Sequence, residues 1–396
     1  MRGAGGPGTT GPARPGGGGV NLLALRSHNA ALVLDLLRAA GDEGISRLEL
    51  AERTGLTPQA VSKITARLRE DGLAAEAGRR ASTGGKPRTV LRLVPEAGHA
   101  VGVHLDRDEV RAVLVDLRGT VVGERRAALD LGAGAEAVLG AVRETVAGVP
   151  ATGSGGGSRR VPAGPGEGAR PGSAGRGPVP LGVGVALPGP LDHARGVLHR
   201  VTGFPEWDGF PLREALAERL GVPVVVDKDT NAAALGLAAG GEGGSFAYLH
   251  LGTGLGAGLV IGGSVHRGAR TGAGEFGHQV IQLDGPPCTC GNRGCVEALC
   301  LGAVERGDLR EAARVLGAGA ANLVGLLDID VVLLGGRTVA AAPETFTDGV
   351  GAVLEAWARR TGQDAVPVRL AADGGGAVAV GAAELVLGPV FGRGGG

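Results

Sequence analysis

The sequence predicts an α/β protein in which a small helical domain with a β-wing precedes a larger region of alternating strands and helices. Three observations support this prediction. Apolar segments of strand length alternate with helical segments over residues 98–388. Two helical segments, separated by a short turn that contains glycine, lie between residues 46 and 70. The length of 396 residues is enough for two or three domains.

Composition and charge narrow the class of protein. The formal net charge is zero, so no global field draws the chain to nucleic acid or to a membrane. Residues 1–95, however, carry 14 Lys and Arg against 8 Asp and Glu, a local charge of +6. The sequence shows neither an apolar run of membrane-spanning length nor a secretion signal. We therefore expect a cytoplasmic protein with no membrane partner.

The first 95 residues divide into a tail and a compact domain. Residues 1–19 are rich in Gly and Pro and are expected to be a disordered tail. Residues 20–95 are expected to form a winged helix-turn-helix domain. The first helix of the helix-turn-helix pair is expected to span roughly residues 46–53. Ser46 caps its N-terminus and Glu49 completes a capping box.

The second helix of this unit begins at Thr57, which caps it, with Pro58 in its first turn. Its apolar spacing predicts a buried face that contains Ala60, Val61, Ile64 and Leu68. The face expected to be exposed contains Gln59, Ser62, Thr65 and the basic residues Lys63 and Arg67. In a helix-turn-helix this second helix enters the major groove of DNA, so Thr57, Gln59, Ser62, Lys63 and Arg67 are candidate DNA contacts.

Two short strands around a basic, glycine-rich tip are expected to follow as the wing. Arg79, Arg80, Lys86 and Arg88 could follow the phosphate backbone or the minor groove. The alternative is an ordinary helical hairpin with a solvated charged face, which the turn, the wing and the local charge excess together disfavour.

The larger region, residues 96–390, opens with an expected strand pair over 98–125 and a helix over 128–149. Residues 150–178 are rich in Gly, Pro, Ser and Arg and are expected to be a disordered insertion. The elements expected beyond the insertion are a strand after Pro180, a helix near 211–220, a strand and helix around 224–236, a strand-turn-strand at 247–266, a buried strand at 330–336 and a C-terminal helix at 377–388.

The strand-turn-strand contains regularly spaced glycines, Gly252, Gly254, Gly256 and Gly258. Backbone N–H groups in such a loop can cradle an anion. No long helix follows these glycines, so the loop is not a dinucleotide-binding fingerprint, and alone it is a weak signal.

A cysteine-rich knuckle gives the most specific signal in the chain. His278, Cys288, Cys290 and Cys295 form the ligand set of a closed tetrahedral zinc site, with glycines where the chain must turn around the ion. The alternative is disulfide bonding, which the close spacing of Cys288 and Cys290 and the expected reducing compartment disfavour. Cys300 lies outside the knuckle in an apolar segment and is expected to be a core residue.

Two carboxylates accompany the knuckle. Glu275 and Glu297 flank His278, whose second ring nitrogen remains available when the first binds a metal. Carboxylates accept hydrogen bonds from hydroxyl groups, so this set suits a polyhydroxylated ligand. It is equally compatible with a turn cap at Glu275 and a helix start at Glu297.

Taken together, these motifs resemble the ROK family of repressors, open reading frames and sugar kinases, and in particular its regulator branch with an N-terminal winged helix. The resemblance covers residues 20–390. It is carried by LPGPL (187–191), DTNAAALG (229–236), LGTGLGAG (251–258), GEFGH (274–278), CTCGNRGCVE (288–297) and VVLLGG (331–336).

This resemblance implies a pair of actin/hexokinase-like α/β lobes with a sugar between them, and a structural zinc held by the histidine and three cysteines. It implies that Glu275, His278 and Glu297 contact sugar hydroxyls and that Asp229 occupies the position of a catalytic base. If ATP binds, Gly252, Thr253, Gly254 and Gly256 would hold its phosphates, and VVLLGG would lie near its adenosine.

The sequence departs from the family's kinases at two places. Where they carry an Asp-x-Gly-Gly-Thr phosphate loop, this chain has Asp106-Arg107-Asp108-Glu109-Val110, whose acids would repel phosphate. Where they carry Asn-Asp, Lys228 precedes Asp229, so one expected sugar contact changes. The segment between Cys300 and Asp330 is also short for the family.

We therefore expect a non-enzymatic, sugar-responsive transcription regulator, best described as a repressor. It would bind operator DNA as a homodimer or homotetramer and respond to a sugar or sugar phosphate. The main alternative is an ATP-dependent hexose kinase, glucokinase-like, with a fused DNA-binding domain and Asp229 as base. A third is a regulator that answers to a protein partner, with Glu275, His278 and Glu297 purely structural.

Overall fold

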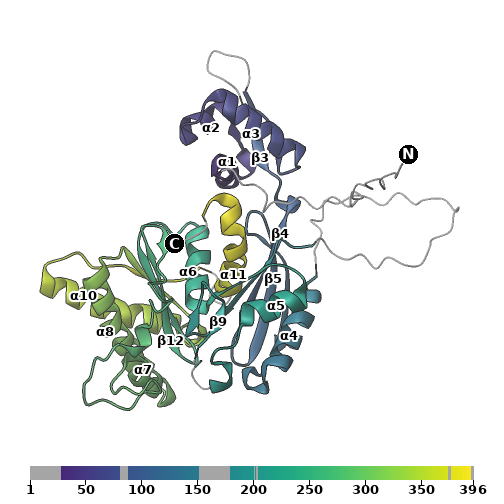
Figure 1. Cartoon of the computed structure of the whole chain (residues 1–396). Helices are drawn as coiled ribbons and strands as arrows, with labels where there is room; N and C mark the ends of the chain where they lie inside the picture. Colours follow the sequence, from purple (N-terminus) through teal and green to yellow (C-terminus); the bar gives the residue numbers. More distant parts are fainter. Residues whose placement is uncertain are drawn as a thin grey trace, which may run out of the picture.

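The structure is a computed structural model that describes residues 28–80, 88–150, 179–199, 201, 204–372 and 376–393. The expected tail at 1–19 and nearly all of the expected insertion at 150–178 lie outside the described residues, as does Lys86. Figure 1 shows a small helical unit above two larger α/β halves.

The N-terminal unit is a winged helix-turn-helix, as predicted. It contains α1 (His28–Ala39), β1 (Ile45–Ser46), α2 (Arg47–Thr54), α3 (Pro58–Glu70), β2 (Ala74–Arg80) and β3 (Arg88–Leu93). The Ser46 side chain accepts a hydrogen bond from the Glu49 N–H, and the Glu49 side chain accepts one from the Ser46 N–H, so the capping box is confirmed. Thr57 caps α3 in the same manner through the Ala60 N–H.

One residue of α3 was assigned to the wrong face. Thr65 is fully buried rather than exposed. Its hydroxyl donates to the Val61 carbonyl at 2.9 Å and accepts from Arg47 Nε at 3.2 Å, so the polar group is satisfied inside the α2–α3 contact. A hydroxyl that can bond back to its own helix does not need solvent, and side-chain polarity alone therefore misassigned it.

Two five-stranded sheets with the same topology form the larger region. The first follows the spatial order β10 (Val224–Lys228), β7 (Val183–Leu187), β4 (His99–Leu105), β5 (Glu109–Asp116) and β6 (Val121–Ala128). The second follows the order β15 (Val368–Leu370), β14 (Val331–Gly335), β11 (Phe246–Leu251), β12 (Leu255–Ile261) and β13 (Ser264–Val265). Each sheet joins an antiparallel meander to two parallel strands. A small hairpin, β8 (Leu191–Asp192) with β9 (Val197–Leu198), extends the first half.

The expected strand pair over 98–125 is in fact three strands. The run from Glu109 turns at Gly119, whose positive φ of 87° permits the reversal, and continues as β6. The expected helix at 128–149 is correspondingly shorter, α4 (Ala135–Ala147). The helix near 211–220 is confirmed as α5 (Leu212–Leu220).

Two helices occupy the space between the sheets in Figure 1, α6 (Asp229–Ala239) and α11 (Ala377–Leu387). α6 begins at Asp229, directly after the end of β10. Their contact is very close, because a Cβ added at Gly381 would lie 1.7 Å from the Ala232 carbonyl oxygen. α11 also lies directly on the first sheet, where a Cβ at Gly184 would meet the Ala382 oxygen at 1.7 Å. Neither contact accommodates a larger residue without displacement of the helix.

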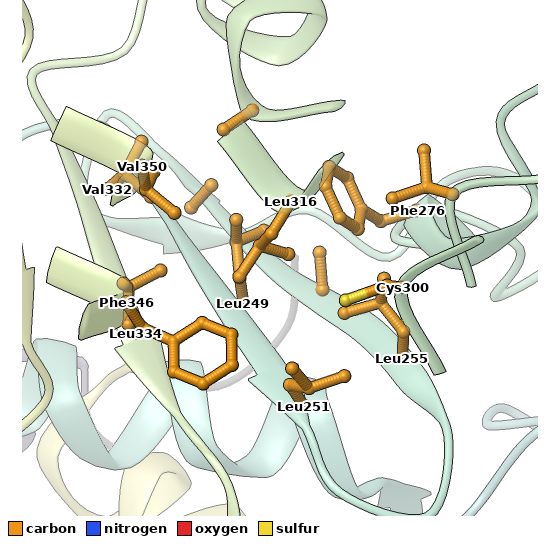
Figure 2. Close-up of a cluster of buried hydrophobic side chains, with 14 of the residues drawn as sticks. Leu249, Leu251, Leu255, Phe276, Cys300, Leu316, Val332, Leu334, Phe346 and Val350 are labelled. Carbon is orange, nitrogen blue, oxygen red and sulfur yellow. The ribbon is translucent and has the colours of Figure 1, made fainter. Parts of the chain in front are cut away.

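The outer layer of the second half consists of α7 (Val296–Glu305), α8 (Leu309–Leu327), α9 (Arg337–Ala341) and α10 (Pro343–Thr361). The segment after Cys300 that is short in sequence is thus filled by helix. These helices enclose the hydrophobic cluster of Figure 2, which includes Phe276, Leu316 and Phe346. No helix in the described ranges is long and apolar enough to cross a membrane.

The helix-turn-helix unit and the first half share one hydrophobic cluster. Leu34 and Leu37 of α1 pack in the same cluster as Ala383 and Leu387 of α11. The helix-turn-helix unit is therefore packed directly on the core helix α11 rather than joined through an open linker.

Candidate functional site

The predicted metal ligands converge in space. The ligand atoms of His278, Cys288, Cys290 and Cys295 all lie within 4.8 Å of one another. His278 Nδ1 lies 3.7 Å from Cys288 Sγ, and Cys290 Sγ lies 3.7 Å from Cys295 Sγ. A tetrahedral zinc with sulfur bonds of about 2.3 Å holds neighbouring sulfurs about 3.8 Å apart. The spacing therefore fits such an ion, and all four cysteines of the chain are free of disulfides.

The chain folds this way locally because glycine permits very tight turns. Gly291 and Gly294 have φ values of 93° and 65°, a region that favours glycine. A Cβ at Gly294 would lie 1.6 Å from the Gln282 oxygen, so no other residue fits there. Burial raises the pKa of Cys295 to about 12, so this thiol becomes a ligand only when a cation replaces its proton.

The knuckle is anchored to the core on both sides. Phe276, between Glu275 and His278, is buried in the cluster drawn in Figure 2. Cys300 lies in the same cluster, with its Sγ 3.5 Å from the Ala312 oxygen, so its prediction as a core residue is confirmed. Cys295 directly precedes α7, whose first turn carries Glu297.

The carboxylates of the candidate sugar site come from both halves. Asp229 starts α6 and accepts a hydrogen bond from the Thr230 N–H at 2.6 Å. Glu297 Oε2 accepts from the Leu255 N–H at 2.9 Å, which fixes it beside the glycine loop. Glu275 is partly exposed and pairs with Lys228 Nζ at 3.1 Å. These contacts leave further lone pairs on each carboxylate that can accept hydroxyl groups.

Asp229 has an unusual proton affinity. Burial raises its pKa to about 7, and the nearby carboxylates of Asp106 and Glu275 act in the same direction. The Thr230 N–H and the Lys228 ammonium oppose the rise. Near neutral pH this carboxyl can therefore either donate or accept a proton.

The glycine loop between β11 and β12 is shaped mainly by packing. A Cβ at Gly258 would lie 2.1 Å from the Thr230 oxygen, and one at Gly256 would lie 3.1 Å from Thr230 Cγ2. The Gly252 N–H is already used, because it donates to the Gly254 oxygen at 2.9 Å. Thr253 at the tip is exposed.

An ion-pair network bridges the two halves of the larger region. Arg337, at the start of α9, donates through Nη2 to Asp106 Oδ2 at 2.5 Å and to Asp108 Oδ1 at 3.2 Å. Asp106 and Asp108 lie in the β4–β5 turn. Their two negative charges are thus partly neutralised by Arg337, a contact that the sequence did not reveal because the residues are distant along the chain.

The sequence reasoning also missed a polar group behind this network. Burial lowers the pKa of His104 to about 4, and it also lowers the pKa of His250. Tyr248 Oη lies 2.9 Å from His250 Nδ1. The available signal was the position of both histidines at the ends of buried strands, where parallel strands meet a cleft.

The candidate DNA-reading face is open to solvent. Thr57, Gln59, Ser62, Lys63, Arg67 and Arg88 are all exposed. The Thr57 hydroxyl already caps α3, which limits it as a reader of bases. Arg67 lies 3.7 Å from Asp71 in an exposed pair that exchanges readily for phosphate. For Arg79 and Arg80 only the backbone, within β2, is described.

Comparison with known proteins is consistent with this arrangement. The model of the ROK family matches residues 176–307, and a model of winged helix-turn-helix DNA-binding domains matches residues 32–74. A xylose repressor from Caldicellulosiruptor bescii is 29% identical over 284 residues, 70% of this chain and 64% of the relative. The alignment thus spans less than two thirds of that repressor.

Two solved structures show the similarity of the fold. A ROK hexokinase from Thermus thermophilus is 30% identical, with a TM-score of 0.57 over 72% of this chain and 96% of the hexokinase. A ROK family transcriptional regulator, described as a homologue of the Escherichia coli MLC protein, is 19% identical, with a TM-score of 0.69 over 93% of this chain and 98% of that protein. The latter comparison includes the N-terminal unit.

Proposed function

Because the chain belongs to the ROK family and carries a winged helix-turn-helix on its core helix, we propose that it is a sugar-responsive transcriptional repressor. The observation that carries the proposal is the shared hydrophobic cluster of α1 and α11. It links an exposed, polar recognition helix to the part of the fold that contains the carboxylates. The name of the xylose repressor relative supports a carbohydrate-linked role.

In this proposal α3 reads the operator. Gln59, Ser62, Lys63 and Arg67 face solvent along one side of α3 and suit base edges and phosphates. The wing would add contacts to the phosphate backbone of the DNA through Arg79, Arg80, Lys86 and Arg88. A homodimer, or a homotetramer built from two, would present two such units to a pseudo-palindromic operator.

The effector would bind between the halves. Asp229, Glu275 and Glu297 would accept hydrogen bonds from its hydroxyl groups. His278 would donate one from Nε2, because Nδ1 faces Cys288. Zn²⁺ held by His278, Cys288, Cys290 and Cys295 would supply a structural cross-link for the loop that bears these residues. All four ligand positions are then filled by protein, which leaves none open for catalysis.

The response would travel through α6 and α11. The N-terminus of α6 lies at the candidate sugar site, and its body contacts α11, which packs against α1. A ligand that binds one arrangement of the halves more tightly shifts operator affinity by that difference. The close glycine contacts favour movement of α6 and α11 as one unit.

The test is operator selection followed by effector titration. The full-length zinc-loaded protein selects its binding sites from a random DNA pool, and the affinity for the selected site is then measured with and without pentoses, hexoses and their phosphates. Sequence-specific binding that a sugar weakens supports a repressor. Specific binding that no sugar changes favours control by a protein partner. The absence of specific binding argues against the regulator.

A hexose kinase is the second candidate. The pKa of Asp229, about 7, suits a general base, and the glycine loop is retained. Against it, Asp106 and Asp108 engage Arg337 where ATP phosphates would have to lie. Sugar-dependent ADP release that Asp229→Ala abolishes would establish the kinase instead.

A further inference from the structure

Lys228 extends into the candidate sugar site. It ends β10 and caps α6, with a side chain only 4% exposed. Its Nζ donates to the Ala273 oxygen at 2.6 Å and to Glu275 Oε1 at 3.1 Å. Its stem lies against Gly189, where an added Cβ would be 2.8 Å from Lys228 Cδ. The ammonium group is therefore held beside Glu275 and shielded from solvent.

A lysine at this position changes what the ligand must offer. The amide of an asparagine both donates and accepts hydrogen bonds, whereas an ammonium group has three donors and no acceptor. Two of the Lys228 donors are used by Ala273 and Glu275. The third has no partner among the described residues, so an oxygen of a bound ligand can accept it, and a charged oxygen is the strongest acceptor.

The surrounding carboxylates are compensated by their own partners. Glu275 forms an ion pair with Lys228. Glu297 lies in the first turn of α7 and accepts a hydrogen bond from the Leu255 N–H. Asp229 lies in the first turn of α6, and its pKa of about 7 leaves it only partly charged. Both helices direct their positive ends toward the site. The field at the ligand position is thus less negative than a count of acids suggests.

We propose that Lys228 sets the charge class of the effector and that the site takes an anionic sugar, a sugar acid or a sugar phosphate, in preference to a neutral or amino sugar. An oxygen of the anion accepts the third Lys228 N–H. The inference rests on the proposed sugar-binding function and specifies the ligand for that site.

The first measurement is calorimetric titration of the full-length zinc-loaded protein with glucose, glucuronate, glucose 6-phosphate and glucosamine. These ligands share one ring and differ in charge. We expect glucuronate or glucose 6-phosphate to bind at least tenfold more tightly than glucose, on the order expected for one charge-assisted hydrogen bond, and glucosamine to bind most weakly. The stronger of the two anions distinguishes a carboxylate from a phosphate ligand.

Two variants of the same ion pair separate charge selection from structural support. Lys228→Asn and Glu275→Gln both remove the Lys228–Glu275 ion pair, but they change the charge of the site in opposite directions. We expect the anion-to-glucose affinity ratio to fall at least fivefold in Lys228→Asn and to rise in Glu275→Gln. Thermal melting verifies that both variants fold. A structural role alone would move the ratio in the same direction in both.

The outcomes also separate this inference from the proposed function. Equal binding of glucose and the anions, or equal shifts in both variants, would overturn the charge selection while leaving a sugar-responsive regulator. No binding by these four sugars or by the pentoses and hexoses of the operator test, with operator binding intact, would overturn both the charge selection and the sugar effector.

Discussion

The ion pair between Arg38 of α1 and Glu384 of α11 connects the DNA-binding unit to the core, and Glu384→Gln tests its importance. The two side chains are 8% and 3% exposed, so solvent screens them little. Arg38 Nη1 donates to Glu384 Oε2 at 3.1 Å, and Arg38 Nη2 also donates to the Arg118 oxygen at 2.9 Å. A Cβ at Gly119 would lie 2.7 Å from Glu384 Oε1, so there is no room for a larger residue beside the pair.

Breaking a buried ion pair by removing one partner typically costs about 3–5 kcal/mol. Arg38 keeps the Arg118 carbonyl and lies 4.7 Å over the Phe391 ring, which retain part of its stabilisation. We therefore expect a loss of about 3 kcal/mol in the free energy of unfolding, the low end of that range. The effect of effector on operator affinity should also shrink, because α11 and α1 no longer move together.

The assay combines urea denaturation, followed by circular dichroism, with operator titration in the presence and absence of effector. The control is Glu136→Gln, which removes an exposed pair with Arg219 and should leave both measurements unchanged. A Glu384→Gln protein with the wild-type midpoint and the wild-type effector response would refute the reasoning.

The other predictions concern the zinc, the DNA, the titration of Asp229 and the helix contact. Cys290→Ser, or chelation of the wild-type protein, should lower the melting temperature and weaken sugar binding. Cys300→Ala should leave the zinc content unchanged. An unaltered melting temperature and sugar affinity in Cys290→Ser would contradict a structural zinc. The double variant Lys63→Ala with Arg67→Ala should reduce the slope of log operator affinity against log salt concentration by up to about 2. As a control, Arg359→Ala with Arg360→Ala on α10 removes the same charge and should leave the slope unchanged. Equal slopes in both double variants would exclude α3 as the helix that contacts the operator. The raised pKa of Asp229, about 7, means that the folded state holds a proton that the unfolded chain releases near pH 4, so this group lowers stability as pH rises from about 4 to 7. Asp229→Asn should therefore stabilise the protein by a few kcal/mol at pH 8 and hardly at all at pH 4, and melting curves with the same difference at both pH values would argue against the buried acid. Gly381→Ala should destabilise by about 1–3 kcal/mol or more, because its methyl group has no space beside Ala232, and a neutral effect in thermal melting would mean that α6 and α11 can separate.

Local sequence patterns were sufficient to predict features whose interactions all lie within one short segment. The capping box of Ser46 and Glu49 and the cap at Thr57 follow from spacing within one helical turn, and they set both helices of the DNA-binding unit. The clustering of His278, Cys288, Cys290 and Cys295 could likewise be predicted, because the short spacing and the glycines bring the three thiols together. The exposed side of α3 followed from helical periodicity, except at Thr65, whose hydroxyl bonds to its own helix.

Contacts between residues distant in sequence were decided only by the tertiary structure. Nothing in the local sequence links Arg337 with Asp108, or Arg38 with Glu384, because each pair is brought together by the packing of separate elements. The repeated topology of the two sheets was also hidden, since the same strand order can be built from unrelated apolar sequences. The sequence by itself therefore determined which candidate chemistry this protein carries, a His/Cys cluster suited to a metal, a set of carboxylates and a helix-turn-helix. The tertiary structure decided which charges compensate one another and how the recognition helix is joined to the cleft, because electrostatic and packing energies depend on distance in space and not on separation along the chain.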